Sequence, residues 1–456
     1  MSKFNPLMFR AYDIRGLVDD DLTEETATII GKGIGSYVQK RWGKRVVVGR
    51  DNRPSSERLK NALVESLEST GCEVFDIGLS TSPMLYAAVA ENKMDAGVNV
   101  TASHNPPKYN GFKIVGRDAY PVGGQDIKDL LELTQSGEFL TGDGQVTTLD
   151  YLDRYIDGIT SRVKPARSLK VAVDTGNGVA GIVMPKLLRA LGCEVIEVCT
   201  ELDGRFPNHI PNPEEEKNLT ELKQQVVASG ADLGIGIDGD GDRIGLIDEK
   251  GRFLEADYII MLLSRDFLSR HPGATILVDV KTSQNTIDFI TKYGGAPMMW
   301  KTGHSLVKQK MREENIILGG ELSGHMFVFE NYYGFDDAAY AGSKIIEFLS
   351  KSDTPVSEYF AGLPKLFSTR LVEVKCDDAI KFDVVEKVKN DFISKYDSLT
   401  IDGIRINFPN GWALVRASNT SGTLTLRFEA KMAADLEKMR EEVFASLEKY
   451  IPVELH

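Results

Sequence analysis

Short apolar runs rich in β-branched residues recur along the chain, and each ends in an aspartate followed by polar residues. Three such runs share the same surroundings, at residues 45–51, 169–178 and 274–283. In each case a segment with helical spacing of its apolar residues follows, then a glycine, then a second apolar run. Continuous apolar runs of this length are typical of strands buried on both faces. The pattern therefore predicts a βαβ unit used three times.

Each of the three units continues through a further strand into a loop of unusual composition. The loops are TASHNP after residues 95–100, DGDGDR after 231–237 and GELSGH from residue 320. Ligands of open parallel sheets bind beyond the carboxyl ends of the strands, so these loops are expected to carry the chemistry. The alternative is that they are only turns of duplicated domains. Turns rarely need Ser-His, three Asp or Glu-Ser-His, which favours a site.

The pattern changes from about residue 366, where short strands alternate with two helical segments. This predicts an antiparallel sheet with helices and a further polar loop, RASNTSG at residues 416–422. The predicted fold class is α/β, with three related α/β domains containing mixed sheets and a C-terminal α+β domain. We expect the domains to span residues 1–148, 149–252, 253–364 and 365–456.

Composition narrows the functional classes. The 456 residues are 42% hydrophobic and 27% charged, as in ordinary soluble proteins, and the net charge is −13. Such a charge disfavours binding to nucleic acid or anionic lipid, so an anionic substrate needs a local basic pocket. The N-terminal residues lack a signal-peptide core, and the longest apolar run, 258–263, is too short to span a membrane. We expect a cytoplasmic monomer or weak homodimer, with four cysteines that lack metal-ligand spacing.

Asp238, Asp240 and Asp242 alternate with glycines, and an extended backbone would aim the three side chains the same way. Converging carboxylates repel one another without a cation, and oxygen ligands favour Mg²⁺ or Ca²⁺. A calcium helix-loop-helix is an alternative, because Glu249 stands at the twelfth position. However, the sixth position is Arg243 rather than glycine, and a strand precedes the loop. Arg243 is better suited to hold an anionic substrate.

Ser103 and His104 stand side by side in TASHNP, where the apolar segment ends. A seryl phosphate is a stable anion that can give one more oxygen to a divalent ion, so Ser103 is a candidate phosphorylated residue and metal ligand. His104 either orients the serine or bonds backbone in the turn. A Ser-His-acid hydrolase is disfavoured, because neighbouring side chains of an extended segment point to opposite faces.

Two further loops suit a phosphorylated sugar. The RASNTSG loop offers a guanidinium, hydroxyls and an amide that fit a phosphate dianion, and GELSGH offers acceptors and donors that fit sugar hydroxyls. The phosphate candidates are Arg416, Ser418, Asn419 and Thr420, and the sugar candidates are Glu321, Ser323 and His325. A polar hairpin and a capped turn remain the structural alternatives for these two loops. Other cationic or titratable candidates are Arg15, Lys113, Lys281 and His304.

FRAYDIRG, TASHNP, DGDGDR, GELSGH and RASNTSG, in this order, resemble the α-D-phosphohexomutases, specifically the bacterial phosphomannomutase/phosphoglucomutase branch. The resemblance implies four domains around a central active-site cleft and a reversible shift of phosphate between O1 and O6 of a hexose. It also implies a phosphoserine at Ser103, Mg²⁺ on the three aspartates and a hexose 1,6-bisphosphate that turns over within the cleft.

The resemblance also assigns roles to individual residues. It makes the residues of the RASNTSG loop a distal phosphate clamp, and Glu321 and Ser323 readers of O3 and O4. It makes Lys113 and His304 general acid/base candidates. Supporting contacts are Tyr12, Arg15, Arg243, Lys281 and His325.

A site that grips O3, O4 and phosphate separates glucose from mannose poorly, since these differ at C2. We therefore expect both mannose and glucose phosphates as substrates, while Gly422, where many branch members have proline, leaves the preferred sugar open. A phosphoglucosamine mutase, a sugar phosphatase and a non-catalytic sugar phosphate sensor are the alternatives. The linker at residues 363–368 is expected to act as a hinge before the fourth domain.

Overall fold

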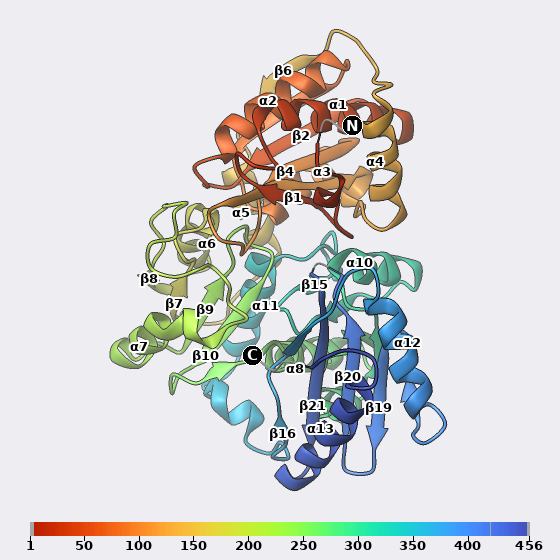
Figure 1. The fold of residues 1–456 in the computed structure, drawn as a ribbon. Helices are drawn as coiled ribbons and strands as arrows, with labels where there is room; N and C mark the ends of the chain where they lie inside the picture. Colours follow the sequence, from red (N-terminus) through yellow and green to blue (C-terminus); the bar gives the residue numbers. More distant parts are fainter. Residues whose placement is uncertain (1–3, 420, 454–456) are drawn as a thin grey trace.

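Four sheets follow one another along the chain in the computed structural model, which describes residues 4–419 and 421–453 (Figure 1). The first sheet has the order β1-β5-β4-β2-β3-β6, in which β5 is antiparallel to both neighbours and the other pairs are parallel. Its strands are β1 (Ile14–Leu17), β2 (Arg45–Arg50), β3 (Glu73–Leu79), β4 (Ala96–Val100), β5 (Tyr109–Gly116) and β6 (Gln145–Thr148). The helices of this domain are α1 (Glu24–Arg41), α2 (Ser56–Ser69), α3 (Ser82–Glu91) and α4 (Gln125–Ser136).

Strand β2 shows why the first sheet is apolar without alternation. Val46 and Val48 pack in the core under α1, α2 and α4, while Val47 packs in the core that contains α3. Helices therefore cover both faces of the sheet, and successive residues of the strand are buried on opposite sides. This confirms the interpretation of residues 45–51 as a strand buried on both faces.

The second and third sheets repeat this arrangement with fewer strands. Their orders are β11-β10-β9-β7-β8 and β13-β12-β14-β15. The second domain contains α5 (Leu152–Arg162), β7 (Lys170–Asp174), α6 (Met184–Ala190), β8 (Glu194–Val198), α7 (Thr220–Ser229), β9 (Leu233–Ile237), β10 (Ile244–Asp248) and β11 (Phe253–Leu254). The third contains α8 (Ala256–Arg270), β12 (Thr275–Asp279), α9 (Gln284–Lys292), β13 (Ala296–Trp300), α10 (His304–Glu313), β14 (Leu318–Gly320), β15 (Met326–Val328) and α11 (Ala338–Leu349).

The fourth domain is an antiparallel sheet with two helices, drawn in blue in Figure 1. Its order is β16-β21-β20-β19-β18, and β17 also pairs with β21. The elements are β16 (Phe367–Ser368), β17 (Val372–Lys375), α12 (Lys381–Phe392), β18 (Ser398–Leu399), β19 (Ile404–Phe408), β20 (Gly411–Ala417), β21 (Thr423–Ala430) and α13 (Ala433–Leu447). The segment 366–376 forms two strands that pair with different parts of β21.

The four polar loops occupy equivalent places. In each of the first three domains a parallel strand turns back into an antiparallel one, and the loop joins them: β4 to β5, β9 to β10, and β14 to β15. In the fourth domain the loop joins β20 to β21. The predicted fold class, three related α/β domains and a C-terminal α+β domain, is confirmed. None of the helices in the described part of the chain has the length and apolar character needed to cross a membrane.

Candidate active site

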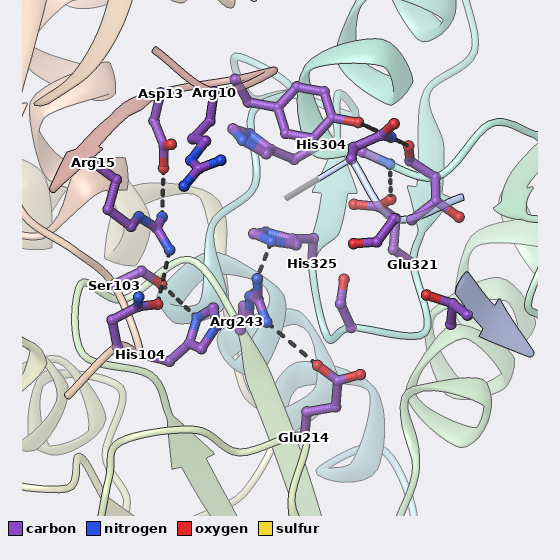
Figure 2. Close-up of a pocket in the computed structure, with 18 of the residues that line it drawn as sticks. Arg10, Asp13, Arg15, Ser103, His104, Glu214, Arg243, His304, Glu321 and His325 are labelled. Carbon is purple, nitrogen blue, oxygen red and sulfur yellow. Dashed lines mark hydrogen bonds and ion pairs between the residues drawn. The ribbon is translucent and has the colours of Figure 1, made fainter. Parts of the chain in front are cut away.

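A cavity of about 470 Å³ is lined by residues from all four domains (Figure 2). Every candidate proposed from the sequence lines it except the three aspartates, which lie buried beside Ser103, and Thr420, which lies outside the described residues. The candidates on its wall are Tyr12, Arg15, Ser103, His104, Lys113, Arg243, Lys281, His304, Glu321, Ser323, His325, Arg416, Ser418 and Asn419. Loops distant in sequence therefore share one cavity.

Ser103 is held in a left-handed backbone conformation directly after β4. Its φ is +49°, its Oγ donates to Asp238 Oδ2 at 2.6 Å, and His104 Nδ1 lies 3.1 Å from the same Oγ. The expectation that His104 points away from Ser103 is wrong, because it assumed extended backbone. A positive φ for a serine is strained and is held by its surroundings. The order of contacts still differs from a Ser-His-acid triad, since the aspartate bonds the serine and not the histidine.

The three aspartates converge, but through a tight turn rather than an extended segment. Asp238 Oδ1 accepts hydrogen bonds from the backbone N–H groups of Gly241, Asp242 and Arg243 at 3.0 to 3.1 Å. Gly241 has a φ of +85°, which closes the turn. One carboxylate oxygen from each aspartate lies within 4.8 Å of the others, so the group can hold a metal ion.

The chemistry of this cluster fits a hard divalent cation. All three aspartates are fully buried, and Oδ1 of Asp240 and of Asp242 has no hydrogen-bond partner among the described residues. Burial, and then the two neighbouring carboxylates, raise the pKa of Asp238 well above its usual range. Buried carboxylates that repel one another and leave oxygens unbonded are satisfied by an ion with oxygen ligands.

Lys113 reaches into the cluster from β5. Its Nζ lies 2.7 Å from Asp240 Oδ2 and 2.5 Å from Asp242 Oδ2. Burial alone would lower the pKa of Lys113, but the two carboxylates raise it well above its usual value. The ammonium group therefore stays charged in this arrangement and partly neutralises the aspartates.

Contacts between the first, third and fourth domains close the opposite side of the cavity. The Tyr12 hydroxyl donates to the Thr302 carbonyl oxygen at 3.1 Å and accepts from Asn419 Nδ2 at 2.5 Å. Arg416 Nε donates to Asp402 Oδ2 at 2.9 Å, while its buried Nη2 has no hydrogen-bond partner among the described residues. Glu321 Oε1 accepts the Gly303 N–H at 2.6 Å. An anion bound at this place can accept a hydrogen bond from Arg416 Nη2.

Four family models match successive parts of the chain, and together they cover most of it. They are described as phosphoglucomutase/phosphomannomutase alpha/beta/alpha domain I at residues 6–141, domain II at 153–251, domain III at 255–367, and the C-terminal domain at 371–446. The chain belongs to the phosphoglucomutase/phosphomannomutase family. The four-domain organisation expected from the sequence is that of the family.

Relatives of known name agree with this membership. The chain is 43% identical over 447 residues to a phosphomannomutase/phosphoglucomutase of Pseudomonas syringae pv. tomato, covering 98% of this chain and 96% of the relative. It is 39% identical to a phosphoglucomutase of Neisseria gonorrhoeae over 97% and 96% of the two chains. A crystal structure of a phosphoglucomutase/phosphomannomutase family protein from Burkholderia thailandensis superposes with a TM-score of 0.93 at 38% identity, covering 99% of both chains.

This family member also contains site residues that the sequence did not single out. Asp336 lies under the cavity, 3.3 Å from His304 Nδ1, 3.0 Å from His325 Nδ1 and 2.7 Å from Lys308 Nζ. Burial opposes the charge of Asp336, but Lys308 and then His304 hold its pKa well below the usual range. Burial, and then Lys308, lower the pKa of His304 to about 4, so this imidazole is neutral at neutral pH. No local pattern marks Asp336 as a site residue, because its partners lie on other elements of the fold.

Cations outnumber anions on the cavity wall, against the net charge of the whole chain. Among the described residues six Arg or Lys and four Asp or Glu line the cavity. The charged lining residues that were not predicted from the sequence are Arg10, Asp13, Glu214 and Glu373. Figure 2 shows Arg243 between His325 and Glu214, to which it donates at 3.1 and 3.4 Å. The wall is thus suited to an anionic ligand.

The calcium helix-loop-helix alternative is contradicted. Strands β9 and β10 flank the aspartate loop, in place of helices. Glu249 lies beyond β10, where its Oε2 accepts the backbone N–H of Ser357 at 3.0 Å. It is therefore a structural contact near the third domain and no ligand of the loop.

Proposed function

We propose that this protein catalyses the reversible transfer of a phosphoryl group between O1 and O6 of hexose phosphates, with mannose and glucose phosphates as substrates. Family membership and the names of the relatives support a phosphomutase of this kind. The observation that carries the proposal is Ser103: its Oγ lies against a buried carboxylate cluster, at the wall of a cavity to which all four domains contribute.

In the proposed reaction Ser103 carries the phosphoryl group at rest. The bond between phosphorus and Ser103 Oγ breaks as phosphorus bonds to a hydroxyl oxygen of the hexose monophosphate, and that hydroxyl loses its proton to a base. The product of this half-reaction is hexose 1,6-bisphosphate. After the intermediate turns over in the cavity, its other phosphoryl group passes to Ser103 Oγ, and the resulting sugar alkoxide is protonated. The bisphosphate thus serves as intermediate and, when supplied, as activator.

Proton transfer is assigned to His304 and Lys113. His304 is neutral at neutral pH and lies on the cavity wall, which suits acceptance of a proton from the sugar. Lys113 is the second candidate from its position beside the aspartates. Tyr12, Arg15, His104, Arg243, Lys281 and His325 are proposed to position the reacting groups.

Mg²⁺ is the proposed metal, with Asp238, Asp240, Asp242 and Ser103 as its ligands. When bound it would polarise the phosphoryl group and offset charge on the leaving oxygen. Three buried carboxylates with two unbonded oxygens support this assignment. The chain's own contribution is to fix Ser103 Oγ against Asp238.

The rest of the substrate would be held across the cavity. Arg416, Ser418, Asn419 and Thr420 are proposed to clamp the phosphate that does not react, and the unbonded Arg416 Nη2 supports this. Glu321 and Ser323 are proposed to bind O3 and O4 of the sugar. Since neither contact distinguishes the configuration at C2, glucose and mannose phosphates should both be accepted as substrates.

Phosphorus NMR tests the proposal with the purified protein, Mg²⁺, a trace of hexose 1,6-bisphosphate, and mannose 1-phosphate or glucose 1-phosphate in separate tubes. Formation of the 6-phosphate supports it, and the ratio of the two rates reports the preferred sugar. Inorganic phosphate as the main product would show a phosphatase instead. Ser103→Ala should abolish turnover while sugar phosphate binding persists, and retained turnover would refute the phosphoserine.

Removal of the metal gives an independent check. Incubation with EDTA should abolish turnover and excess Mg²⁺ should restore it, while Asp240→Asn should not respond to Mg²⁺.

We also propose domain limits at residues 1–148, 149–252, 253–364 and 365–456, and a cytoplasmic monomer or weak homodimer. Sedimentation of the purified protein tests the oligomeric state.

A further inference from the structure

A second group of metal-ligating side chains lies in the second domain, away from the cavity wall. Asp174, Cys199 and His209 each bring one ligand atom within 4.8 Å of the other two. Asp174 is the last residue of β7 and Cys199 directly follows β8, the parallel neighbour of β7. The residues therefore meet because parallel strands end at the same edge of a sheet.

Both ring nitrogens of His209 face groups that only accept hydrogen bonds. Nδ1 lies 3.0 Å from the Ile210 carbonyl oxygen, and Nε2 lies 3.2 Å from Oδ1 and 3.1 Å from Oδ2 of Asp174. A neutral ring has one proton for these two nitrogens, so the other nitrogen needs a further cation, either a second proton or a metal ion. With Nδ1–H donated to the Ile210 carbonyl, that cation lies between Nε2 and Asp174. A backbone carbonyl that fixes the tautomer is the usual support of a histidine ligand.

The Cys199 thiol adds a soft ligand to this pair. Its Sγ lies 3.6 Å from Glu221 Oε2. Burial, followed by Asp174 and Glu221, raises the pKa of this thiol to about 12, so without a bound cation it stays protonated. The Cys199 carbonyl accepts from Thr175 Oγ1 at 3.1 Å and from the Asn177 N–H at 2.7 Å, which fixes this residue against the loop after β7.

We propose that Asp174, Cys199 and His209 bind a borderline-soft divalent metal ion such as Zn²⁺, and that the exposed carboxylate of Glu221, which now contacts only Cys199 of the three, turns toward the ion as the fourth ligand. One sulfur, one nitrogen and two oxygens suit a tetrahedral zinc site, unlike the all-oxygen site beside Ser103. Zinc bonds of about 2.0 to 2.3 Å at tetrahedral angles separate ligand atoms by roughly 3.2 to 3.6 Å. The distance from His209 Nε2 to Asp174 Oδ1, 3.2 Å, and that from Cys199 Sγ to Glu221 Oε2, 3.6 Å, lie within this range.

The proposed ion would fasten the loops that support the catalytic aspartates. The loop containing His209 continues to Pro211, whose carbonyl accepts the Gly239 N–H at 3.2 Å, next to Asp238. The loop after β7 accepts a hydrogen bond at the Asn177 carbonyl from Asn52 of the first domain, at 2.7 Å. Zinc at this place would stabilise the second domain and its contact with the first without touching the reacting atoms.

Titration of the full-length protein with Co²⁺, in excess Mg²⁺ to occupy the oxygen site, tests the proposal. We expect one Co²⁺ per chain with a thiolate charge-transfer band and tetrahedral d–d absorption, displaced by Zn²⁺ with release of protons. Cys199→Ser should lose the band, and both Cys199→Ser and His209→Gln should weaken Zn²⁺ at least 100-fold. Cys376→Ser removes a buried thiol in the fourth domain and should bind as the wild type does.

Glu221→Ala is a variant that should fold as the wild type does, since the side chain is exposed. It should keep the charge-transfer band, because the thiolate remains, and weaken Zn²⁺ about tenfold. Zn²⁺ should raise the unfolding temperature of the wild type and leave that of Cys199→Ser unchanged. Absence of the thiolate band from the wild type, or equal Zn²⁺ binding by folded Cys199→Ser, would overturn the proposal.

Discussion

Arg53 is predicted to hold the loop of Ser103 in its active shape, although it does not line the cavity. The side chain is fully buried in the first domain. Its guanidinium donates to four backbone carbonyls of this loop, of Ser103 at 2.7 Å, Asn105 at 2.6 Å, Pro106 at 2.8 Å and Tyr109 at 3.2 Å. It also donates to Asp51 Oδ2 at 3.0 Å. The strained backbone of Ser103 is thus stabilised by one planar fork of donors.

The substitution Arg53→Lys removes the forked set of hydrogen-bond donors while it keeps the positive charge. A lysine can keep the ion pair with Asp51 but cannot reach four diverging carbonyls, because its three donors share one nitrogen. Loss of four bonds at about 1 kcal/mol each gives a destabilisation of about 4 kcal/mol. For a domain of this size that corresponds to a fall of about 10 °C in the unfolding temperature. Displacement of Ser103 Oγ by about 1 Å would lower kcat about 100-fold.

Differential scanning calorimetry and steady-state kinetics with glucose 1-phosphate measure the two effects. KM should change little, because the proposed sugar contacts, Glu321 and Ser323, lie elsewhere in the cavity. Arg58→Lys is the matched control: this arginine bonds the exposed carboxylates of Glu24 and Asp19, so both readouts should stay within error of the wild type. An Arg53→Lys variant with the unfolding temperature and kcat of the wild type would show that the loop keeps its shape without the fork.

Three further predictions follow from individual contacts. Burial raises the pKa of Asp337 to about 6 from an unfolded value near 3.9, so its stabilisation, about 3 kcal/mol, is complete below about pH 4 and is lost as pH rises through 6. Asp337→Asn should flatten this fall in thermal unfolding, and an unchanged profile would contradict the assignment. Tyr12→Phe removes the hydroxyl that joins the first domain to the third and fourth; it should raise KM and the release of bisphosphate several-fold, and unchanged partitioning of the intermediate would argue against that role. Gly362→Ala adds a methyl group in open space beside the proposed hinge at 363–368, and should slow turnover while reducing bisphosphate release; equal kcat and release would exclude a hinge there.

Most strands of this protein were predictable because their signal is local. Runs such as residues 45–50 are buried on both faces, so hydrophobicity alone marks them as strands. Helix ends were marked by glycines, and Gly192 and Gly294 have positive φ after α6 and α9. The division of segment 366–376 into two strands has no local signal, because it depends on pairing with β21, which lies more than 40 residues later.

The site was predictable where a residue's chemistry is visible in its own loop. Three aspartates or a Ser-His pair after a strand have few structural uses, so sequence sufficed to select them. Arg53, Lys308 and Asp336 act through partners that only the tertiary fold brings near, so nothing local distinguishes them from surface charges. The wrong expectation for His104 had a different origin. Left-handed φ at Ser103 depends on hydrogen bonds to distant residues, which no local pattern reports.

The repeated topology explains why the reaction needs the whole chain. Each domain presents one loop between neighbouring strands, and each loop has different chemistry: a hydroxyl, three carboxylates, a proposed sugar-binding set and a proposed phosphate clamp. No single domain contains both a phosphoryl acceptor and the means to neutralise and orient the sugar phosphate. Contacts such as Tyr12 with Asn419, and Ser103 with Asp238, join loops from different domains. Activity should therefore depend on the relative position of the domains, and variants at such contacts should reduce turnover more than stability.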